Sequence, residues 1–213
     1  MTVRPSPEIS TRKQPRQARS AELVATILDA AVQVLAKEGA QRFTTARVAE
    51  KAGVSVGSLY QYFPNKAAIL FRLQSDEWRS TTALLRSILE QEGTPPLARL
   101  RTLVHAFIRS ECEEAEMRLA LSDAAPLYRD APEAKTARER GRRTFEAFMH
   151  EVLANAPEAV RDTAGDLITA TLGQVGKRFS ETPRTEAEIA AYADAMADMF
   201  CAYLERLGQA ETR

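Results

Sequence analysis

The chain has 213 residues, 45% of them hydrophobic, which is enough for one small and one larger domain. Its two cysteines, Cys112 and Cys201, are too few for a disulfide framework, so we expect a reducing cytoplasm. No apolar run approaches the roughly 20 residues of a membrane span, and the N-terminus lacks the apolar core of a secretory signal, so no membrane is expected as a partner.

Charge is distributed unevenly along the chain. The 29 basic and 29 acidic residues cancel, which alone would argue against a nucleic acid as partner. Residues 1–66, however, carry ten Lys or Arg against five Asp or Glu, and the remainder carries 19 against 24. This asymmetry is typical of one basic, phosphate-facing module joined to a body that does not bind nucleic acid.

The first 19 residues are expected to form a flexible basic arm. Residues 1–14 are polar, prolines stand at positions 5, 7 and 15, and four cations cluster before the first helix: Arg12, Lys13, Arg16 and Arg19. We interpret the arm either as a solvated tail or as a segment that contacts nucleic acid in a minor groove or along the backbone.

The helical pattern begins at Ser20. Apolar residues recur at helical spacing from Leu23 to Leu35, which predicts a helix over Ser20–Lys37. Gly39 is expected to end this helix.

Residues 44–66 predict two short helices joined by a tight turn. The first would run from about Ala46 to Ala52, and Gly53 would adopt the left-handed conformation that the turn needs. Ser55 is a good N-cap for a second helix over Val56–Tyr62. This is helix-turn-helix geometry, which places the second helix in a DNA major groove.

The second helix of this hairpin has an apolar and a polar side. Leu59 and Phe63 are expected to face the core, whereas four side chains that can bond phosphates or base edges point away from it: Ser58, Tyr60, Gln61 and Tyr62. Asn65 can cap the next helix, so that Lys66 falls in its first turn. A cation there opposes the helix dipole, and a nearby phosphate would explain it. A helical hairpin with a merely polar outer face is the alternative.

The rest of the chain predicts further helices and no strand. Apolar periodicity places them at Asn65–Gln91, Pro96–Glu114, Met117–Ala124, Glu133–Ala154, Asp162–Phe179 and Ala187–Leu207. Gly93–Pro96 and the prolines at 126 and 132 separate them. The fold class expected is therefore all-α.

The last two of these helices predict an interface between two copies of the chain. Small and apolar residues cover a wider arc than one core-facing surface needs. Glycine in a helix costs about 1 kcal/mol relative to alanine, so close packing would compensate it. The residues expected at this interface are Leu172, Gly176, Met196, Met199, Phe200 and Tyr203. A thick monomeric core is the alternative.

A search for catalytic chemistry finds little. The two histidines, His105 and His150, lie on different predicted helices, and His105 with Cys112 supplies only two of the ligands that a zinc site needs. The sequence contains no glycine-rich phosphate loop and no nucleophile or metalloprotease motif. We therefore expect neither a cofactor nor a metal, and an all-α enzyme is the competing hypothesis.

The segment Ile27–Leu70 resembles the DNA-binding domain of TetR-type bacterial transcription regulators. The resemblance is carried by a first helix that ends in glycine, a threonine before the hairpin, AGVS at the turn, LYQYF on the second helix and the lysine that opens the next. It implies that Thr44 or Thr45, Tyr60 and Lys66 hold phosphates. It also implies base-facing positions at Val56, Gly57, Ser58, Gln61 and Tyr62, with apolar contact or close backbone approach at the first two.

The resemblance further implies an arm over 1–19, a DNA-binding domain over 20–66 and a helical ligand-binding and dimerisation domain over 67–213. The protein would be a dimeric repressor of a palindromic DNA operator, released by a small-molecule effector. An activator or a ligand-independent DNA-binding protein of the same fold is the alternative. Candidate pocket residues, although most residues at such helical spacing are plain core, are Trp78, His105, Phe107, Met117, Tyr128, Phe145, Phe148 and Met149.

Overall fold

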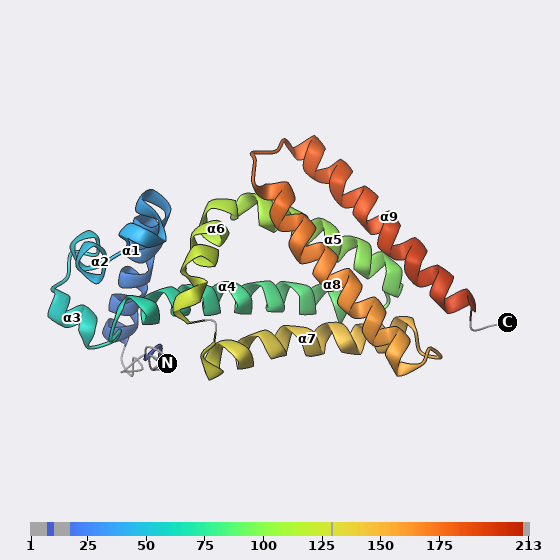
Figure 1. Cartoon of the computed structure of the whole chain (residues 1–213), viewed down its shortest axis with the longest axis horizontal. Helices are drawn as coiled ribbons and strands as arrows, with labels where there is room; N and C mark the ends of the chain where they lie inside the picture. Colours follow the sequence, from blue (N-terminus) through green and yellow to red (C-terminus); the bar gives the residue numbers. More distant parts are fainter. Residues whose placement is uncertain (1–7, 11–17, 129, 211–213) are drawn as a thin grey trace, which may run out of the picture. The chain divides into compact units, whose positions relative to one another are not determined.

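The structure, a computed structural model, describes residues 8–10, 18–128 and 130–210. These residues form nine α-helices and one short 3₁₀ turn, without a strand among them, which confirms the all-α fold class (Figure 1). The helices are α1 Ala18–Arg42, α2 Thr45–Lys51, α3 Val56–Tyr60, α4 Lys66–Leu89, α5 Pro96–Glu113, α6 Ala115–Ala124, α7 Pro132–Val152, α8 Glu158–Ser180 and α9 Glu186–Ala210. The 3₁₀ turn is Ala125–Leu127. No helix in the described ranges is both long and apolar enough to cross a bilayer.

These helices form two compact units. The first consists of the described residues up to Trp78 together with Glu116–Ala137, and the second of Arg79–Ala115 with the described residues from Arg138 onward. Helices α4 and α7 contribute to both units, and α6 belongs almost entirely to the first, which the sequence pattern did not indicate. The functional division at residues 19 and 66 stays a prediction.

The first unit has its own hydrophobic core. Its largest fully buried side chains include Ile27, Leu35, Phe43, Leu59, Phe63, Ile69, Leu70 and Leu121. Each contributes roughly 1.5–3 kcal/mol through burial. Gly39 breaks α1 with φ 72° and ψ 169°, as expected of a helix-ending glycine. The helix resumes for residues 40–42, so the predicted end of the first helix is a kink.

Part of the predicted arm belongs to this core. Ile9 is 4% exposed and packs in the first unit, so the expectation of a flexible tail is wrong for residues 8–10. Arg19 already lies in α1. Three of the arm's cations, Arg12, Lys13 and Arg16, lie outside the described residues.

In the second unit α5 packs against α8 and α9. The core between them includes Leu100, Leu103, Val104, Ile108, Ile168, Leu172, Met196 and Phe200. Polar pairs flank this core on the α9 side: Arg101 bonds Asp198, and Nε2 of His105 lies 3.0 Å from Oδ1 of Asp194. Farther along, Arg109 pairs with Glu186 at 2.6 Å. His105 therefore links two helices.

Most of the predicted dimer residues are also part of this core, and for them the interface prediction is wrong. Leu172, Met196 and Phe200 are 3–5% exposed within a single chain. Gly176 is buried against α5, where an added Cβ would lie 3.2 Å from Phe107. Only Met199, at 52% exposed, and the half-buried Tyr203 stay available to a partner. The apolar arc is wide because α5 occupies much of it.

Candidate nucleic-acid interface and effector cavity

Two capped helices and a glycine turn build the hairpin of the first unit. Thr44 caps α2, with its Oγ1 accepting a hydrogen bond from the Arg47 amide at 3.3 Å. Gly53 has φ 68°, the left-handed conformation predicted for it, and Ser55 caps α3 by accepting from the Ser58 amide at 3.0 Å. The helix-turn-helix expected from the sequence is therefore present.

The second helix of the hairpin is shorter than predicted. It ends at Tyr60, and the amides of Tyr62 and Phe63 both donate to the carbonyl of Leu59, at 3.0 Å. This tightened turn changes the helical phase, so Tyr62 joins Phe63 inside the core at 5% exposed. The prediction that the Tyr62 side chain faces the bases is wrong.

The remaining predicted positions of α3 form an exposed face. Val56 is 39% and Tyr60 40% exposed, Gly57 and Gln61 are exposed, and Ser58 is half-buried with its hydroxyl 2.8 Å from that of Ser55. Gly57 has no positive φ, and a Cβ there would meet only the Ser55 hydroxyl, at 3.8 Å. The fold itself therefore does not require glycine at this position.

Phosphate-binding candidates lie beside this face. The hydroxyls of Thr45 and Tyr60 share a hydrogen bond of 3.2 Å, which brings two donors from α2 and α3 together. Lys66 is the first residue of α4, and Oδ1 of Asn65 caps that helix by accepting from the Ala68 amide at 2.9 Å, as predicted. The hydroxyl of Thr44 caps α2, whereas that of Thr45 is bonded to Tyr60 beside the exposed face of α3.

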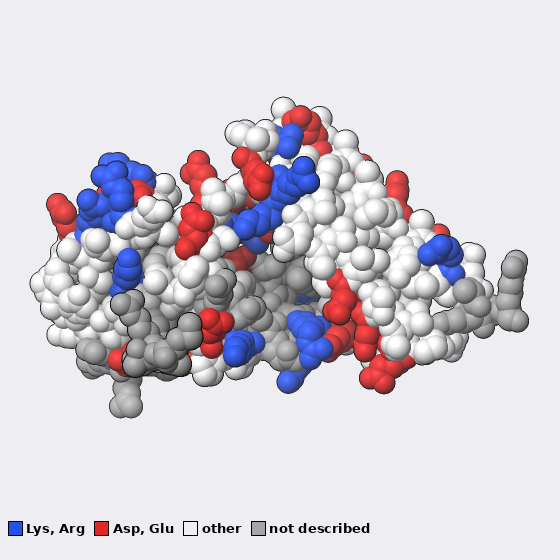
Figure 2. Space-filling model, viewed as in Figure 1, with Lys and Arg blue, Asp and Glu red and all other residues white. Residues whose placement is uncertain are grey.

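Further basic side chains gather over α1 and α2, where Figure 2 shows a blue cluster. A groove of about 480 Å³ there is lined by Gln33, Val34, Lys37, Glu38, Arg47, Glu50 and Lys51. Arg47 bonds the carboxylate of Glu38 and the carbonyl of Arg42. This pairing holds the end of α1 against α2.

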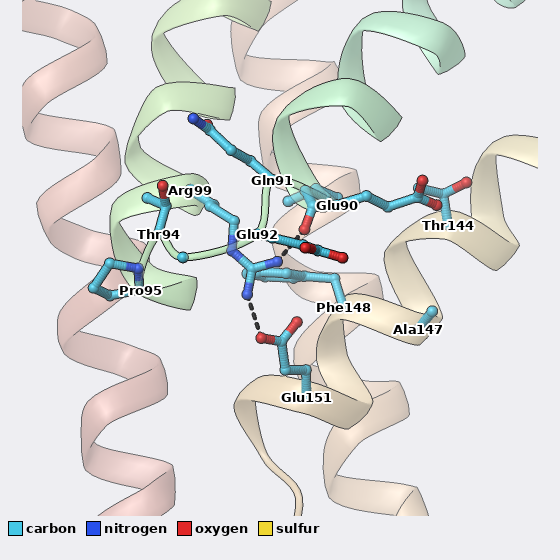
Figure 3. A pocket seen from close by; sticks show the side chains of 12 residues that line it. Glu90, Gln91, Glu92, Thr94, Pro95, Arg99, Thr144, Ala147, Phe148 and Glu151 are labelled. Carbon is cyan, nitrogen blue, oxygen red and sulfur yellow. Dashed lines mark hydrogen bonds and ion pairs between the residues drawn. The ribbon is translucent and has the colours of Figure 1, made fainter.

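The second unit contains a cavity of about 590 Å³. It lies where α4 ends, α5 begins and α7 passes, and the connecting loop turns at Gly93, which has φ 75° (Figure 3). Its lining consists of Leu89, Glu90, Gln91, Glu92, Gly93, Thr94, Pro95, Arg99, Thr144, Ala147, Phe148 and Glu151.

Arg99 dominates the chemistry of this cavity. It is only 6% exposed, and its guanidinium donates to the carbonyl of Leu89 at the end of α4 and to the carboxylate of Glu151 on α7 (Figure 3). The same group lies 5.8 Å from the centre of the Phe148 ring. Its Nε is buried and has no hydrogen-bond partner among the described residues. A buried donor without a partner costs free energy, so the burial of Arg99 carries an energetic penalty even though the residue joins three helices.

The lining is acidic on balance. Its described charged residues are Glu90, Glu92, Glu151 and Arg99. Arg99 pairs with Glu151, and Glu90 pairs with Arg86 at 2.9 Å. Glu92 is left without a basic partner in the described part of the chain, so the lining carries more negative than positive charge.

The predicted pocket residues are not brought together. Phe148 alone among the eight lines the cavity. Phe145 and Met149 lie against α8 at Gly165, Phe107 lies against Gly176, and His105 faces α9. The other three belong to the first unit: Trp78, Met117 and Tyr128. The Tyr128 hydroxyl donates to the carbonyl of Leu121 at 3.1 Å, and burial, with a smaller effect of Glu77, raises the pKa of Tyr128.

Sequence reasoning missed the charged residues of the cavity. Arg99 stands between Leu97 and Leu100 in an apolar helical stretch, where arginine is ordinarily exposed. The break at Gly93–Pro96 was the available signal, because loops placed by helices commonly carry function. No group of three or more metal-binding side chains is found among the residues that the structure describes.

Two family models match the chain. One, described as bacterial regulatory proteins of the tetR family, matches residues 27–73, which contain the hairpin. The other, described as a tetracyclin repressor-like C-terminal domain, matches residues 95–207, more than half of the chain. The chain belongs to the TetR family. The resemblance carried by Ile27–Leu70 is thereby confirmed.

Among curated proteins, a nucleoid occlusion factor and several transcription regulators are similar to parts of the chain. The nucleoid occlusion factor SlmA of Vibrio campbellii is 31% identical over 121 residues, which are 56% of this chain and 59% of SlmA. The transcriptional repressor KstR of Rhodococcus jostii is 26% identical over 144 residues, 68% of this chain and 64% of KstR. The chain thus spans less than two thirds of the length of these relatives.

Solved structures share the TetR fold over nearly the whole chain. The fatty acid degradation regulator FadR from Bacillus halodurans superposes with a TM-score of 0.67 at 19% identity, covering 88% of this chain and 97% of FadR. FadR from Bacillus subtilis, solved in complex with stearoyl-CoA, gives 0.65 at 17% identity and covers 83% of this chain and 97% of that one. At these identities the likeness shows the fold alone.

Proposed function

We propose that this TetR-family protein is a transcription repressor that binds a palindromic DNA operator as a dimer and is released by a small-molecule effector. The exposed face of α3 carries the proposal. Val56, Gly57 and Gln61 are exposed there, on a helix held by a cap at Ser55 and a core contact at Leu59. A short helix presented in this way fits the DNA major groove.

The face divides into two kinds of contact. The Thr45–Tyr60 hydroxyl pair and Lys66 are suited to phosphate oxygens, which fix the register of the protein on DNA without reading sequence. Gln61 can bond a base edge with both amide groups, and Val56 can contact a thymine methyl group. Gly57 permits the backbone to approach the bases closely.

The partner for dimerisation is a second copy of the chain. Leu167 on α8 and Met199 on α9 are each 52% exposed, and the exposed small residues of α9 include Ala191, Ala195 and Ala202. Small side chains let two helices approach closely, and exposed large apolar residues supply the buried area. A two-fold dimer matches the symmetry of a palindromic operator.

The effector site is the Arg99 cavity, and its acidic lining selects a small organic cation. The positive group would lie beside Glu92 and near the Phe148 ring, since carboxylates and aromatic faces both attract cations. The stearoyl-CoA of the Bacillus subtilis relative carries phosphates, which this lining would repel. An effector acts only by the difference of its affinities for the DNA-bound and free conformations.

The DNA-binding half is tested by selecting a duplex from a random library with the full chain and titrating it by fluorescence anisotropy. Binding with two-fold symmetry in the selected sequence is expected. Failure to enrich any sequence would overturn the assignment of α3. Transcription in vitro from a promoter that overlaps the selected site then separates a repressor, which lowers transcript yield, from an activator, which raises it.

The effector half is tested with choline and its uncharged analogue 3,3-dimethylbutan-1-ol. We expect calorimetry to show saturable binding of choline alone, abolished by Glu92→Gln, together with weaker operator binding. Release of DNA by stearoyl-CoA, or equal binding of the neutral analogue, would contradict a cation site. DNA affinity that responds to neither compound would favour the ligand-independent alternative.

A further inference from the structure

Three residues near the N-terminus, Glu8 to Ser10, contact the rest of the first unit, which contains the helix-turn-helix. Ile9 is 4% exposed and is counted among the core side chains of that unit. The carbonyl of Glu8 accepts a hydrogen bond of 2.8 Å from Nδ2 of Asn65. The Ser10 hydroxyl donates to Oε1 of Glu133, in the first turn of α7, at 3.0 Å. The segment thus contacts the start of α4 and the start of α7.

The contact with Asn65 involves a residue with two roles. Its Oδ1 caps α4 by accepting from the amide of Ala68 at 2.9 Å, and its Nδ2 is bound by Glu8. An asparagine side chain has one acceptor and one donor end, and occupying both fixes which end points where. The Glu8 carbonyl therefore holds the Asn65 amide in the orientation that caps the helix.

Lys66 follows directly as the first residue of α4. The first turn of a helix lacks internal partners for its amides, so it frays unless a cap satisfies them. An oriented Asn65 keeps this turn formed and keeps the Lys66 backbone in one position. The burial of Ile9 keeps the Glu8 carbonyl in place, because withdrawing it would expose an apolar side chain to water.

We propose that residues 8–10 are a positioning strap for DNA binding: Ile9 anchors the strap in the core, and the Glu8 carbonyl orients Asn65 so that α4 presents Lys66 to a phosphate. The inference rests on the proposed function. It assigns the N-terminal segment a role other than charge, because Ile9 and the Glu8 carbonyl carry none.

The test compares variants of the full chain that break the strap at different points. Ile9→Ala removes the anchor, and Ile9→Val keeps most of it. Asn65→Ser keeps an uncharged N-cap acceptor but removes the amide donor to Glu8. The double variant Arg12→Ala with Lys13→Ala leaves the strap residues intact and removes two cations. Each variant is measured for Ala68 amide hydrogen exchange and for operator affinity across a salt series.

Ile9→Ala and Asn65→Ser are expected to speed Ala68 exchange and to weaken operator binding about three- to tenfold, the loss of about one hydrogen bond. The slope of log affinity against log salt should flatten by no more than the Lys66 contact accounts for, about 0.9 per lost phosphate contact, and Ile9→Val should behave like the wild type. The double variant should leave Ala68 exchange unchanged and flatten the slope if its cations contact phosphates.

Unchanged Ala68 exchange in both Ile9→Ala and Asn65→Ser would overturn the strap. Faster Ala68 exchange with unchanged operator affinity would also overturn it, because the strap would then order the start of α4 without affecting DNA binding. If Ile9→Ala does not fold, Asn65→Ser decides alone, since its side chain lies at the edge of the core. If the wild-type chain binds no DNA, the proposed function fails, and the exchange data still show whether the strap orders α4.

Discussion

At the scale of the residue, neighbours on α3 serve different purposes. Tyr60 shares a hydrogen bond with Thr45, which places its hydroxyl beside α2, whereas Gln61 is exposed on the next position. The first arrangement suits a phosphate, which is the same for every DNA sequence. The second suits a base edge, which differs from one base pair to another. Affinity and specificity can therefore be separated by single substitutions.

Gln61→Ala should reduce the free-energy preference for the operator over random DNA by about 1–3 kcal/mol, because a base contact is lost. Lys66→Ala should weaken binding to both duplexes by similar factors and should flatten the salt dependence by about 0.9 per lost phosphate contact. Parallel anisotropy titrations on the two duplexes measure both quantities. An unaltered ratio in Gln61→Ala would show that this side chain does not read sequence.

Tyr62→Ala should act on stability. The side chain is 5% exposed, and truncating a large buried aromatic residue costs about 3–5 kcal/mol. Urea unfolding should show this loss for Tyr62→Ala and almost none for Gln61→Ala, its exposed neighbour. Equal stability of the two variants would contradict the burial of Tyr62 and leave its side chain available to contact bases.

The Tyr62 error shows where reasoning from sequence ends at this scale. The positions of Gly53, Ser55, Leu59 and Asn65 were predictable, because a left-handed turn, a cap and a core contact each require a particular residue type. Tyr62 depends on whether the last turn is tight or regular, and one hydrogen bond from its amide to Leu59 decides that. The sequence pattern does not predict this hydrogen bond.

At the scale of the element, side-chain hydrogen bonds secure α4 at both ends. Asn65 caps its start, and Arg99 of α5 donates to the carbonyl of Leu89 at its end. A cation near a helix C-terminus is also favourable to the helix dipole. Both attachments use side chains that join α4 to another segment.

Arg99→Met should lower the free energy of unfolding by about 1–3 kcal/mol, since it leaves the Leu89 carbonyl without its partner. Glu151→Gln should cost less than about 1 kcal/mol, because its carboxylate is half-exposed to water. Urea titrations of the two variants give the comparison. A greater loss in Glu151→Gln would mean that the ion pair, and not the helix end, is the main contribution of Arg99.

Helix starts and stops were predictable to a few residues, whereas helix partners were not. The Thr185–Glu188 capping box at the start of α9 is local: the Thr185 amide donates to the Glu188 carboxylate at 2.8 Å. The backbone and side-chain hydrogen bonds from Thr185 lower the pKa of Glu188. Which face of α9 meets α5 depends on residues about 90 positions away, such as the His105–Asp194 pair, so periodicity alone assigned Phe200 and Met196 to the wrong surface.

At the scale of the whole molecule, the proposed dimer depends on what α8 and α9 leave exposed after their own core is made. The apolar arc in the sequence placed both Phe200 and Met199 at the interface. The structure separates this residue, at 3% exposed, from its neighbour Met199, at 52%. The two positions therefore test folding and assembly independently.

Met199→Glu should yield a folded monomer, because the charge would be buried at the interface between two chains without a partner. Phe200→Glu should give unfolded or insoluble protein, because it buries the same charge inside one chain. Sedimentation velocity and circular dichroism distinguish the two results. A Met199→Glu protein that still sediments as a dimer would move the interface away from this part of α9.

Gly57 is a position on the exposed face of α3 where other side chains can be introduced. Its backbone has no positive φ, and a side chain built there meets only the Ser55 hydroxyl, at 3.8 Å. Alanine at this position should stabilise α3 by up to about 1 kcal/mol, whereas a larger side chain would replace the close backbone approach to DNA that we propose for Gly57. A substitution here is therefore expected to alter recognition without destabilising the fold. Retargeting this regulator to another operator can begin with a single codon.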